Sequence, residues 1–310
     1  MSKGKWGESF LKSGLPLEHL TLMTLRSLGW SCYPHITYER KNREGQNSWF
    51  ELDSLAIYDK ENNNTQLSFL IECKYHDLSR FWFFLPYIKS ALDSDKFSDD
   101  SILNIAPLQT LANPRNSTFL NLAPTSSWGI VVSEDGSKQD NAVNTAIQQL
   151  ANGFVPHCMD MSFASYMVKY HVTPFVQALI PMIVTNAKIY ILKQSVSDLD
   201  VIRNATSPEQ IADETQWTWC YFQPSELQLR NNFDFIDEYK KDSSTKSICK
   251  VSPFKERMYT FALRPQWILI INIKSLENAI NTITSIFMSL PTKKIHDILM
   301  PQKDKQKKTK

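Results

Sequence analysis

The sequence predicts an α/β protein with a mixed central β-sheet flanked by helices. Two observations carry this prediction: short apolar runs rich in strand-forming residues recur along the chain, and stretches with helical spacing of apolar residues alternate with them. Hydrophobic residues make up 42% of the 310 residues, which is enough to build a large core. The predicted order is helix, strands, helix, strands, helix, without an internal repeat.

The helices are predicted from the spacing of apolar residues and from residues that start or stop a helix. The first 30 residues read as helix. Pro16 fits a first helical position, Gly29 fits the stop, and four leucines recur at roughly helical spacing: Leu17, Leu20, Leu25 and Leu28. The stretch QDNAVNTAIQQLANG (139–153) predicts an amphipathic helix that its last glycine terminates. A final helix is expected at 275–290.

Three strands are expected at 30–38, 49–58 and 66–74. The polar stretch DKENNNTQ between the second and the third is typical of a hairpin turn, so these two strands should lie side by side. Residues 179–192 read as a hairpin of two strands turned at Asn186. The stretches SWGIVVS and WILIINI are further core strands.

The composition disfavours several classes of protein. The net charge of +2 gives no strong field toward a nucleic acid or a membrane. Five scattered cysteines without a CxxC pair argue against a disulfide framework and a common zinc module. Nucleotide-binding glycine motifs, GxSxG and HExxH are absent. The N-terminal MSKGKWGESF lacks the apolar run of a secretion signal, so we expect a cytoplasmic protein without a membrane partner.

Two strands end in charged residues that share a face. In LIECK, Glu72 and Lys74 point the same way because strand side chains alternate, and in FELD, Glu51 and Asp53 do so. A hairpin would bring Asp53 and Glu72 within reach of each other. Two such carboxylates repel when partly buried, and a hard cation such as Mg²⁺ relieves that repulsion. The alternative is a surface ion pair at a sheet edge, which is common and energetically minor.

Several motifs together resemble the PD-(D/E)XK nuclease superfamily. These are GLPLE (14–18), ELDSLAIY (51–58) and LIECKY (70–75), followed by WFFLP, the AIQQL helix and PMIVTNAKIYIL. The resemblance spans residues 6–192 and implies a restriction-endonuclease-like core over 1–194. In that interpretation residues 76–126 hold an insertion, packed by its aromatic side chains rather than free to stack on bases.

The remaining chain lies outside the resemblance. Residues 195–290 would form an extension that completes the core or carries specificity. The segment 291–310 ends in PQKDKQKKTK and is expected to be a disordered basic tail.

The resemblance also implies roles for individual residues. Asp53 and Glu72 match the metal-binding carboxylates, Lys74 matches the catalytic lysine, the Cys73 carbonyl would be a further metal ligand, and Glu18 matches a helical glutamate that assists metal binding in some branches. The residue before Asp53 is leucine, where the name-giving motif has proline; many active members share that departure.

Four further side chains are candidates around this site. Glu51 could act from behind the metal ligands. His76, Arg40 and Lys41 could contact phosphate, although a histidine after a strand is more often an ordinary loop residue.

The resemblance implies hydrolysis of phosphodiester bonds with Mg²⁺ or Mn²⁺, in DNA, with RNA not excluded and endonuclease action favoured. A restriction or anti-phage defence setting follows by analogy, in which the chain could act with partner proteins or as a homodimer. The alternative is a non-catalytic nucleic-acid-binding or scaffold protein that keeps the same fold.

Overall fold

The computed structural model describes residues 5–41, 46–60, 65–77, 79–88, 118–135, 139–169, 176–246, 248–250, 258–265 and 267–289. The middle of the predicted insertion and the basic tail fall outside these residues. The helices are α1 (Lys5–Lys12), α2 (Leu15–Ser27), α4 (Ala142–Lys169), α5 (Leu199–Asn204), α6 (Glu226–Tyr239) and α8 (Leu276–Ser289). Short 3₁₀ helices lie at η2 (Leu120–Leu122), η3 (Pro208–Gln210), η4 (Ile248–Lys250), η5 (Met258–Leu263) and η6 (Ile273–Ser275).

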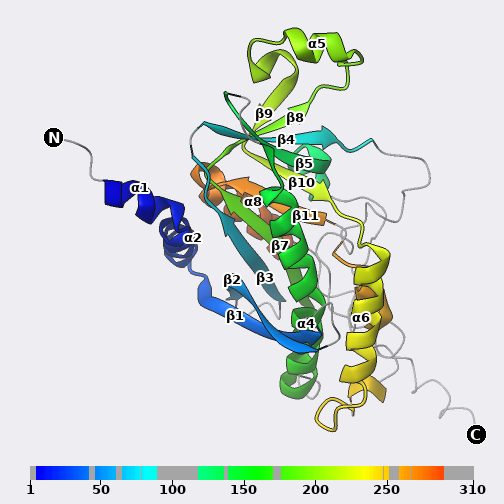
Figure 1. Ribbon diagram of the computed structural model, residues 1–310. Coiled ribbons are helices and arrows are strands. Elements are labelled where there is room, and N and C mark those ends of the chain that lie inside the picture. Colours follow the sequence, from blue (N-terminus) through cyan, green and yellow to red (C-terminus); the bar gives the residue numbers. More distant parts are fainter. Residues whose placement is uncertain are drawn as a thin grey trace, which may run out of the picture.

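All the described strands belong to one mixed sheet (Figure 1). They are β1 (Ser31–Lys41), β2 (Asn47–Lys60), β3 (Thr65–Lys74), β4 (Arg80–Pro86), β5 (Thr125–Ser133), β6 (Gln139–Asp140), β7 (Val176–Thr185), β8 (Lys188–Leu192), β9 (Ala212–Thr215), β10 (Trp217–Tyr221) and β11 (Trp267–Asn272). The order is β1-β2-β3-β7-β11-β10-β5-β4-β8-β9, with β6 beside β5. Neighbours β3 and β7, β7 and β11, β5 and β10, and β4 and β8 run parallel; the other pairs are antiparallel. The predicted mixed α/β class is confirmed.

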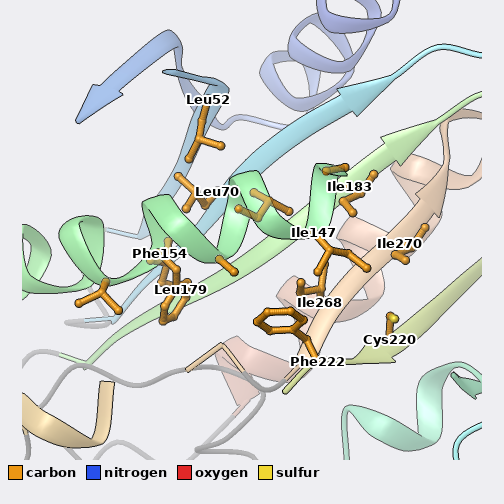
Figure 2. Close-up of a cluster of buried hydrophobic side chains, with 14 of the residues drawn as sticks. Leu52, Leu70, Ile147, Phe154, Leu179, Ile183, Cys220, Phe222, Ile268 and Ile270 are labelled. Atoms are coloured by element: carbon orange, nitrogen blue, oxygen red, sulfur yellow. The ribbon is translucent and has the colours of Figure 1, made fainter. Parts of the chain in front are cut away.

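Two apolar cores lie on the two faces of this sheet. The α4-side core joins α4 to β3, β7 and β11; in Figure 2, Ile147 and Phe154 lie over Leu70, Leu179 and other strand residues. The second core, here the α2–α8-side core, joins α2 and α8 to the opposite face of the same strands. Both faces are therefore covered, as the nearly continuous apolar runs of β3, β7 and β11 require.

The predicted N-terminal helix is wrong in one respect, because the chain forms two helices there. Gly14 separates α1 from α2 and adopts a left-handed backbone with φ of 85°. That conformation ends a right-handed helix and suits glycine, which has no Cβ to clash. The predicted stop at Gly29, also at φ 85°, is confirmed.

The predicted hairpin over 179–192 is also wrong. β7 and β8 both form, but β7 pairs with β3 and β11, whereas β8 pairs with β4 and β9. Asn186 lies at a corner instead: its Oδ1 accepts a hydrogen bond from the His76 amide and its Nδ2 donates to the His76 carbonyl, both at 2.7 Å. This tie holds the β3–β4 bend beside the β7–β8 bend, so two parallel strands turn the corner together.

The segment RFWFFLP, expected to lie within an insertion, is the interior strand β4. Trp82 and Phe84 point into the α4-side core and are fully buried. Phe81 and Phe83, which alternate with them, contact the ring of Tyr190 on β8. Because both faces of β4 carry aromatic side chains, its strand period does not appear as an alternation of apolar and polar residues.

The segment after residue 195 supplies two interior strands. β10 and β11 lie between β5 and β7 in the sheet, and their Trp219 and Trp267 side chains are fully buried. By contrast, α5 projects with β8 and β9 at one end of the molecule (Figure 1) and has no buried residue. Much of this segment is therefore part of the same sheet and cores.

Helix α4 does not stop at Gly153, as predicted, but continues to Lys169. Gly153 faces the β1–β2 hairpin, and a Cβ placed on it would lie 2.5 Å from Leu52 Cδ1 and 2.9 Å from Tyr38 Cε1. Its lack of a side chain therefore lets the hairpin pack against α4. Glycine here serves a close approach between two elements and not a helix end.

The tight approach at Gly153 leads to a stability prediction. Gly153→Ala should lower the free energy of unfolding by about 1 kcal/mol, because overpacking outweighs the gain in helix propensity. Gly7→Ala is the matched control, since a Cβ at Gly7 in α1 would meet nothing within 4 Å. It should be neutral or stabilise by up to about 1 kcal/mol. Urea unfolding of both variants checks this, and equal effects would contradict the role given to Gly153.

Candidate functional site

The candidate site lies where β2 separates from β3. The β2–β3 ladder ends at the pair Ser54 and Ile71, whereas β3 remains paired with β7 up to Lys74. Beyond this point β2 continues its ladder with β1. Asp53, Glu72 and Lys74, called the carboxylate site below, therefore lie where the two strands diverge.

Asp53 is held at this point by the backbone of β3. Its Oδ2 accepts a hydrogen bond of 2.5 Å from the Cys73 amide. Burial raises the pKa of Asp53, while the Cys73 amide and the charge of Lys74 oppose the rise. The carboxylate is thus fixed on the strand that carries the other two residues of the site.

Glu72 is buried and only half satisfied. Its residue is 1% exposed, and its Oε1 accepts a hydrogen bond of 2.6 Å from Lys74 Nζ. Its Oε2 is buried and has no hydrogen-bond partner. Burial, reinforced by the charge of Asp53, raises the pKa of Glu72 to about 7, although Lys74 and a hydrogen bond from the Asp53 backbone oppose that rise. A buried carboxylate oxygen without a partner is costly, so this oxygen is the atom of the site with the most to gain from binding a cation.

Helix α2 brings Glu18 toward the carboxylate site. The α2 helix is attached to β3 by Thr21, whose Oγ1 accepts a hydrogen bond from Cys73 Sγ at 3.6 Å and donates to the Leu17 carbonyl at 2.8 Å. Burial, followed by the charge of Asp53, raises the pKa of Glu18, and the charge of Lys74 partly offsets this. Glu18 therefore lies close enough to the carboxylate site to interact with it electrostatically.

The sequence interpretation missed His35, which forms an ion pair with Glu51. Its Nδ1 donates to Glu51 Oε1 over 2.6 Å, and both side chains are exposed. In the β1–β2 ladder His35 lies between Pro34, which pairs with Ser54, and Ile36, which pairs with Leu52. His35 also has a φ of 53°, in the left-handed region that costs a non-glycine residue about 1–2 kcal/mol. Sequence spacing gives no sign of that backbone conformation, although Glu51 itself was predicted near the site.

The hairpin changes sides of the sheet at this point. On one side of His35 and Asp53, Cys32 and Ala56 pack in the α2–α8-side core. On the other side, Tyr38 and Leu52 pack in the α4-side core. All four positions are even-numbered, so a regular strand would keep them on one face. The two strands therefore turn over together at the residues that border the site.

Asp53 and Glu72 carry oxygen donors of the kind that a small hard cation takes. Among the described residues, no group of three or more histidine, cysteine, aspartate or glutamate side chains is placed to hold a metal. The role of Glu18 in metal binding stays a prediction. Mg²⁺ is usually held by one or two carboxylates and keeps several waters. Asp53 and Glu72, with the unpartnered Oε2 of Glu72, supply two such carboxylates. The Cys73 carbonyl stays a predicted ligand.

His76 is not placed for the predicted phosphate contact. It is buried at the corner between β3 and β4, and its ring lies edge-on to Trp82 with 5.5 Å between ring centroids. Its backbone is engaged by Asn186. The position following a strand suggested an open loop, but the corner closes over it.

Arg40 was expected to contact phosphate, but its buried side chain is not placed to do so. It lies in β1 and is buried, with Nη1 donating to the Asn152 carbonyl at 2.6 Å and Nη2 donating to Asn232 Oδ1. Burial lowers its pKa. Arg40 thus connects the hairpin to α4 and α6. Lys41 ends β1, and its side chain lies outside the described part of the chain.

The buried position of Arg40 predicts a structural effect of its removal. Arg40→Ala should lower the free energy of unfolding by about 2–4 kcal/mol, because Asn232 loses its partner and a void forms. Arg230→Ala is the matched control, because Arg230 is exposed and pairs with Glu226 within α6. It should change stability by less than about 0.5 kcal/mol. Denaturant unfolding tests both, and a stable Arg40→Ala protein would contradict the role described.

Comparison of the chain with protein-family models, curated proteins and solved structures gives no match. The similarity to the PD-(D/E)XK superfamily therefore depends on the motifs quoted above, their order and the chemistry of the residues. No helix among the described residues has the length and apolar character needed to cross a membrane.

The raised pKa of Glu72 predicts how metal binding depends on pH. A metal binds the ionised carboxylate, so below pH 7 it must displace a proton and binds more weakly. The increase in Tm caused by Mg²⁺ should therefore be larger at pH 8 than at pH 6, and Glu72→Gln should reduce it at both. Without metal, ionisation of Glu72 is less favourable in the folded than in the unfolded chain. The wild type should thus lose stability relative to Glu72→Gln as pH rises from 5 to 8. A Mg²⁺ effect independent of pH would contradict this assignment.

Proposed function

We propose that this protein is a metal-dependent nuclease that hydrolyses phosphodiester bonds, with DNA as its substrate. The observation that carries the proposal is the buried Oε2 of Glu72, which has no partner although it lies in a site with Asp53 and Lys74. A carboxylate pair with an oxygen free for a cation, and an ammonium beside it, is a donor set suited to metal-assisted phosphodiester hydrolysis.

Asp53 and Glu72 would hold Mg²⁺ or Mn²⁺. When bound, such an ion polarises a phosphate oxygen and lowers the pKa of a coordinated water. The Cys73 amide keeps Asp53 in place through its 2.5 Å hydrogen bond, so this carboxylate is oriented before any ligand arrives.

Lys74 supplies a positive charge at the same place. Its Nζ lies 2.6 Å from Glu72 Oε1, and 25% of its side chain is exposed. An ammonium in this position can orient the attacking water and stabilise negative charge that develops on the phosphate. Burial on the protein side strengthens both effects, because screening by solvent is weak there.

The arrangement of elements around the site supports a restriction-endonuclease-like core as part of the proposal. The strands β1, β2, β3 and β7 are neighbours in the sheet, α2 lies on one face and α4 on the other. The motif position occupied by Leu52 instead of proline has a local explanation: Leu52 is fully buried and packs near Gly153 of α4. A restriction or defence role, with partner proteins or a second copy, would follow from the same analogy.

One observation favours the alternative of a binding or scaffold protein without catalysis. Lys74 already neutralises one oxygen of Glu72, so part of the burial cost of this carboxylate is met without a metal. Such a protein could bind nucleic acid through the same surface and leave it intact.

The deciding experiment is cleavage of supercoiled plasmid, linear duplex, single-stranded DNA and RNA with Mg²⁺ or Mn²⁺. The wild type should cleave at least one of these substrates, and Asp53→Ala and Lys74→Ala should each reduce the rate by about 100-fold or more. Lys188→Ala is the matched control, because Lys188 also pairs with a glutamate but lies on β8 with a half-exposed side chain. It should retain wild-type activity.

Three outcomes would reject the nuclease proposal or its site. Equal activity in all variants would indicate a contaminant and remove the assignment to the carboxylate site. Binding of nucleic acid without cleavage would favour the non-catalytic alternative. Cleavage that persists in EDTA would exclude the metal requirement.

A further inference from the structure

His35 and Glu51 lie beside the carboxylate site but are not assigned a role in it by the metal chemistry. The imidazole Nδ1 lies 2.6 Å from Glu51 Oε1, and 63% of the His35 side chain is exposed. Its neighbours in β1, Pro34 and Ile36, pair with Ser54 and Leu52, the residues on either side of Asp53. A positive charge on His35 would lower the pKa of the Asp53 and Glu18 carboxyl groups. A histidine is therefore held at the accessible edge of the site.

The hydrogen bond to Glu51 fixes how the ring can act. Because Nδ1–H donates to the Glu51 carboxylate, Nε2 is the nitrogen left to interact with a substrate. In the doubly protonated ring, Nε2–H can donate to an acceptor while Glu51 keeps the ring in position. Orientation of an imidazole by a carboxylate is a recurring device for positioning a proton donor or acceptor.

Stability does not account for this arrangement. An ion pair between two exposed side chains contributes little to folding. Yet His35 sits in the middle of β1 with a φ of 53°, a backbone conformation that is unfavourable for a histidine. A sparsely populated backbone conformation at the edge of a candidate active site is a reason to look for function.

The other charged groups around Asp53 are less suited to donate a proton to a departing group. The groups that interact electrostatically with the Asp53 carboxyl are Lys74, Glu51, His35, Glu72 and Glu18, and the last two carboxyl groups are assigned to the metal. Lys74 is bonded to Glu72, and Glu51 is bonded to His35. The His35 side chain is exposed, and its Nε2 is not used by the bond to Glu51. His35 is therefore the group of this set with a nitrogen that can donate a proton to a substrate.

We propose that His35 is a catalytic residue that donates its Nε2 proton to the oxygen leaving phosphorus, with Glu51 as the positioning residue. The inference rests on the proposed nuclease function. The water oxygen forms a bond to phosphorus, the bond from phosphorus to the leaving oxygen breaks, and that oxygen takes the proton from Nε2 and departs as a hydroxyl. The attacking water releases one proton to solvent, and a solvent proton later restores His35, so protons and charge balance.

The left-handed backbone of His35 permits an unusually clean test. Glycine is well suited to a φ of 53°, so His35→Gly should keep the β1 backbone while it opens an imidazole-sized space beside Glu51. Asparagine also tolerates this conformation but leaves less room for an added ring. His35→Asn therefore removes the imidazole without creating the same space. His19→Ala is a further control, because His19 is an exposed histidine on α2 next to Glu18.

The measurement is the rate of plasmid nicking with Mg²⁺, with and without added imidazole. His35→Gly should lose about 100-fold in rate, within the range typical of general acid catalysis, and free imidazole should restore much of it. Imidazole should not restore His35→Asn, and rescue should be weaker in His35→Gly combined with Glu51→Gln. His19→Ala and imidazole added to the wild type should have little effect.

The outcomes separate this inference from the nuclease proposal. If the wild type nicks plasmid and Lys74→Ala does not, the nuclease proposal stands independently of His35. Wild-type activity in His35→Gly would then overturn the role of His35. So would a loss that imidazole fails to restore, because that pattern indicates a structural role. An inactive wild type overturns both proposals.

Discussion

The hydrogen bond from the Cys73 amide to Asp53 is the interaction on which the site depends. It joins Asp53, one residue beyond the end of the ladder on β2, to Cys73, two residues beyond that end on β3. A carboxylate oxygen therefore accepts a bond that a strand carbonyl would otherwise accept. The Cys73 amide is therefore satisfied although β2 departs from β3. The same bond places Asp53 on the strand that carries Glu72 and Lys74, and it lets the hairpin cross to the α4 side of the sheet.

The charged groups of the site are held in an arrangement that is electrostatically unfavourable for them. Two carboxyl groups have raised pKa values because they are buried, and the Oε2 of Glu72 has no hydrogen bond. The surrounding structure stabilises this arrangement through two apolar cores and the tie between His76 and Asn186. Local rules of folding are usually violated where a protein acts, and the violation here coincides with the residues that the sequence selects.

The sequence pattern predicted the features that depend on residues close together in the chain. The period of a strand and a short hairpin turn placed Asp53, Glu72 and Lys74 together. Pairings between distant segments were not readable, which is why β7 and β8 were taken for a hairpin and the role of Gly153 was missed. Arg40 and His76 have polar neighbours in sequence, but β1, α4 and the corner at Asn186 bury them. The backbone conformation of His35 has no sequence signature, because glycine and asparagine are the residues expected there.

The position of β10 and β11 determines where the chain can be divided. A fragment that ends at residue 194 would keep β7 and β5 but lose the two strands between them, so both would become unprotected edges with unpaired backbone groups. It would also expose apolar surface that Trp219 and Trp267 now cover. Such a fragment would tend to aggregate through its open edges. Residue 194, the end of the segment suggested by motif similarity, is therefore not a position at which this protein can be divided into independently folding parts.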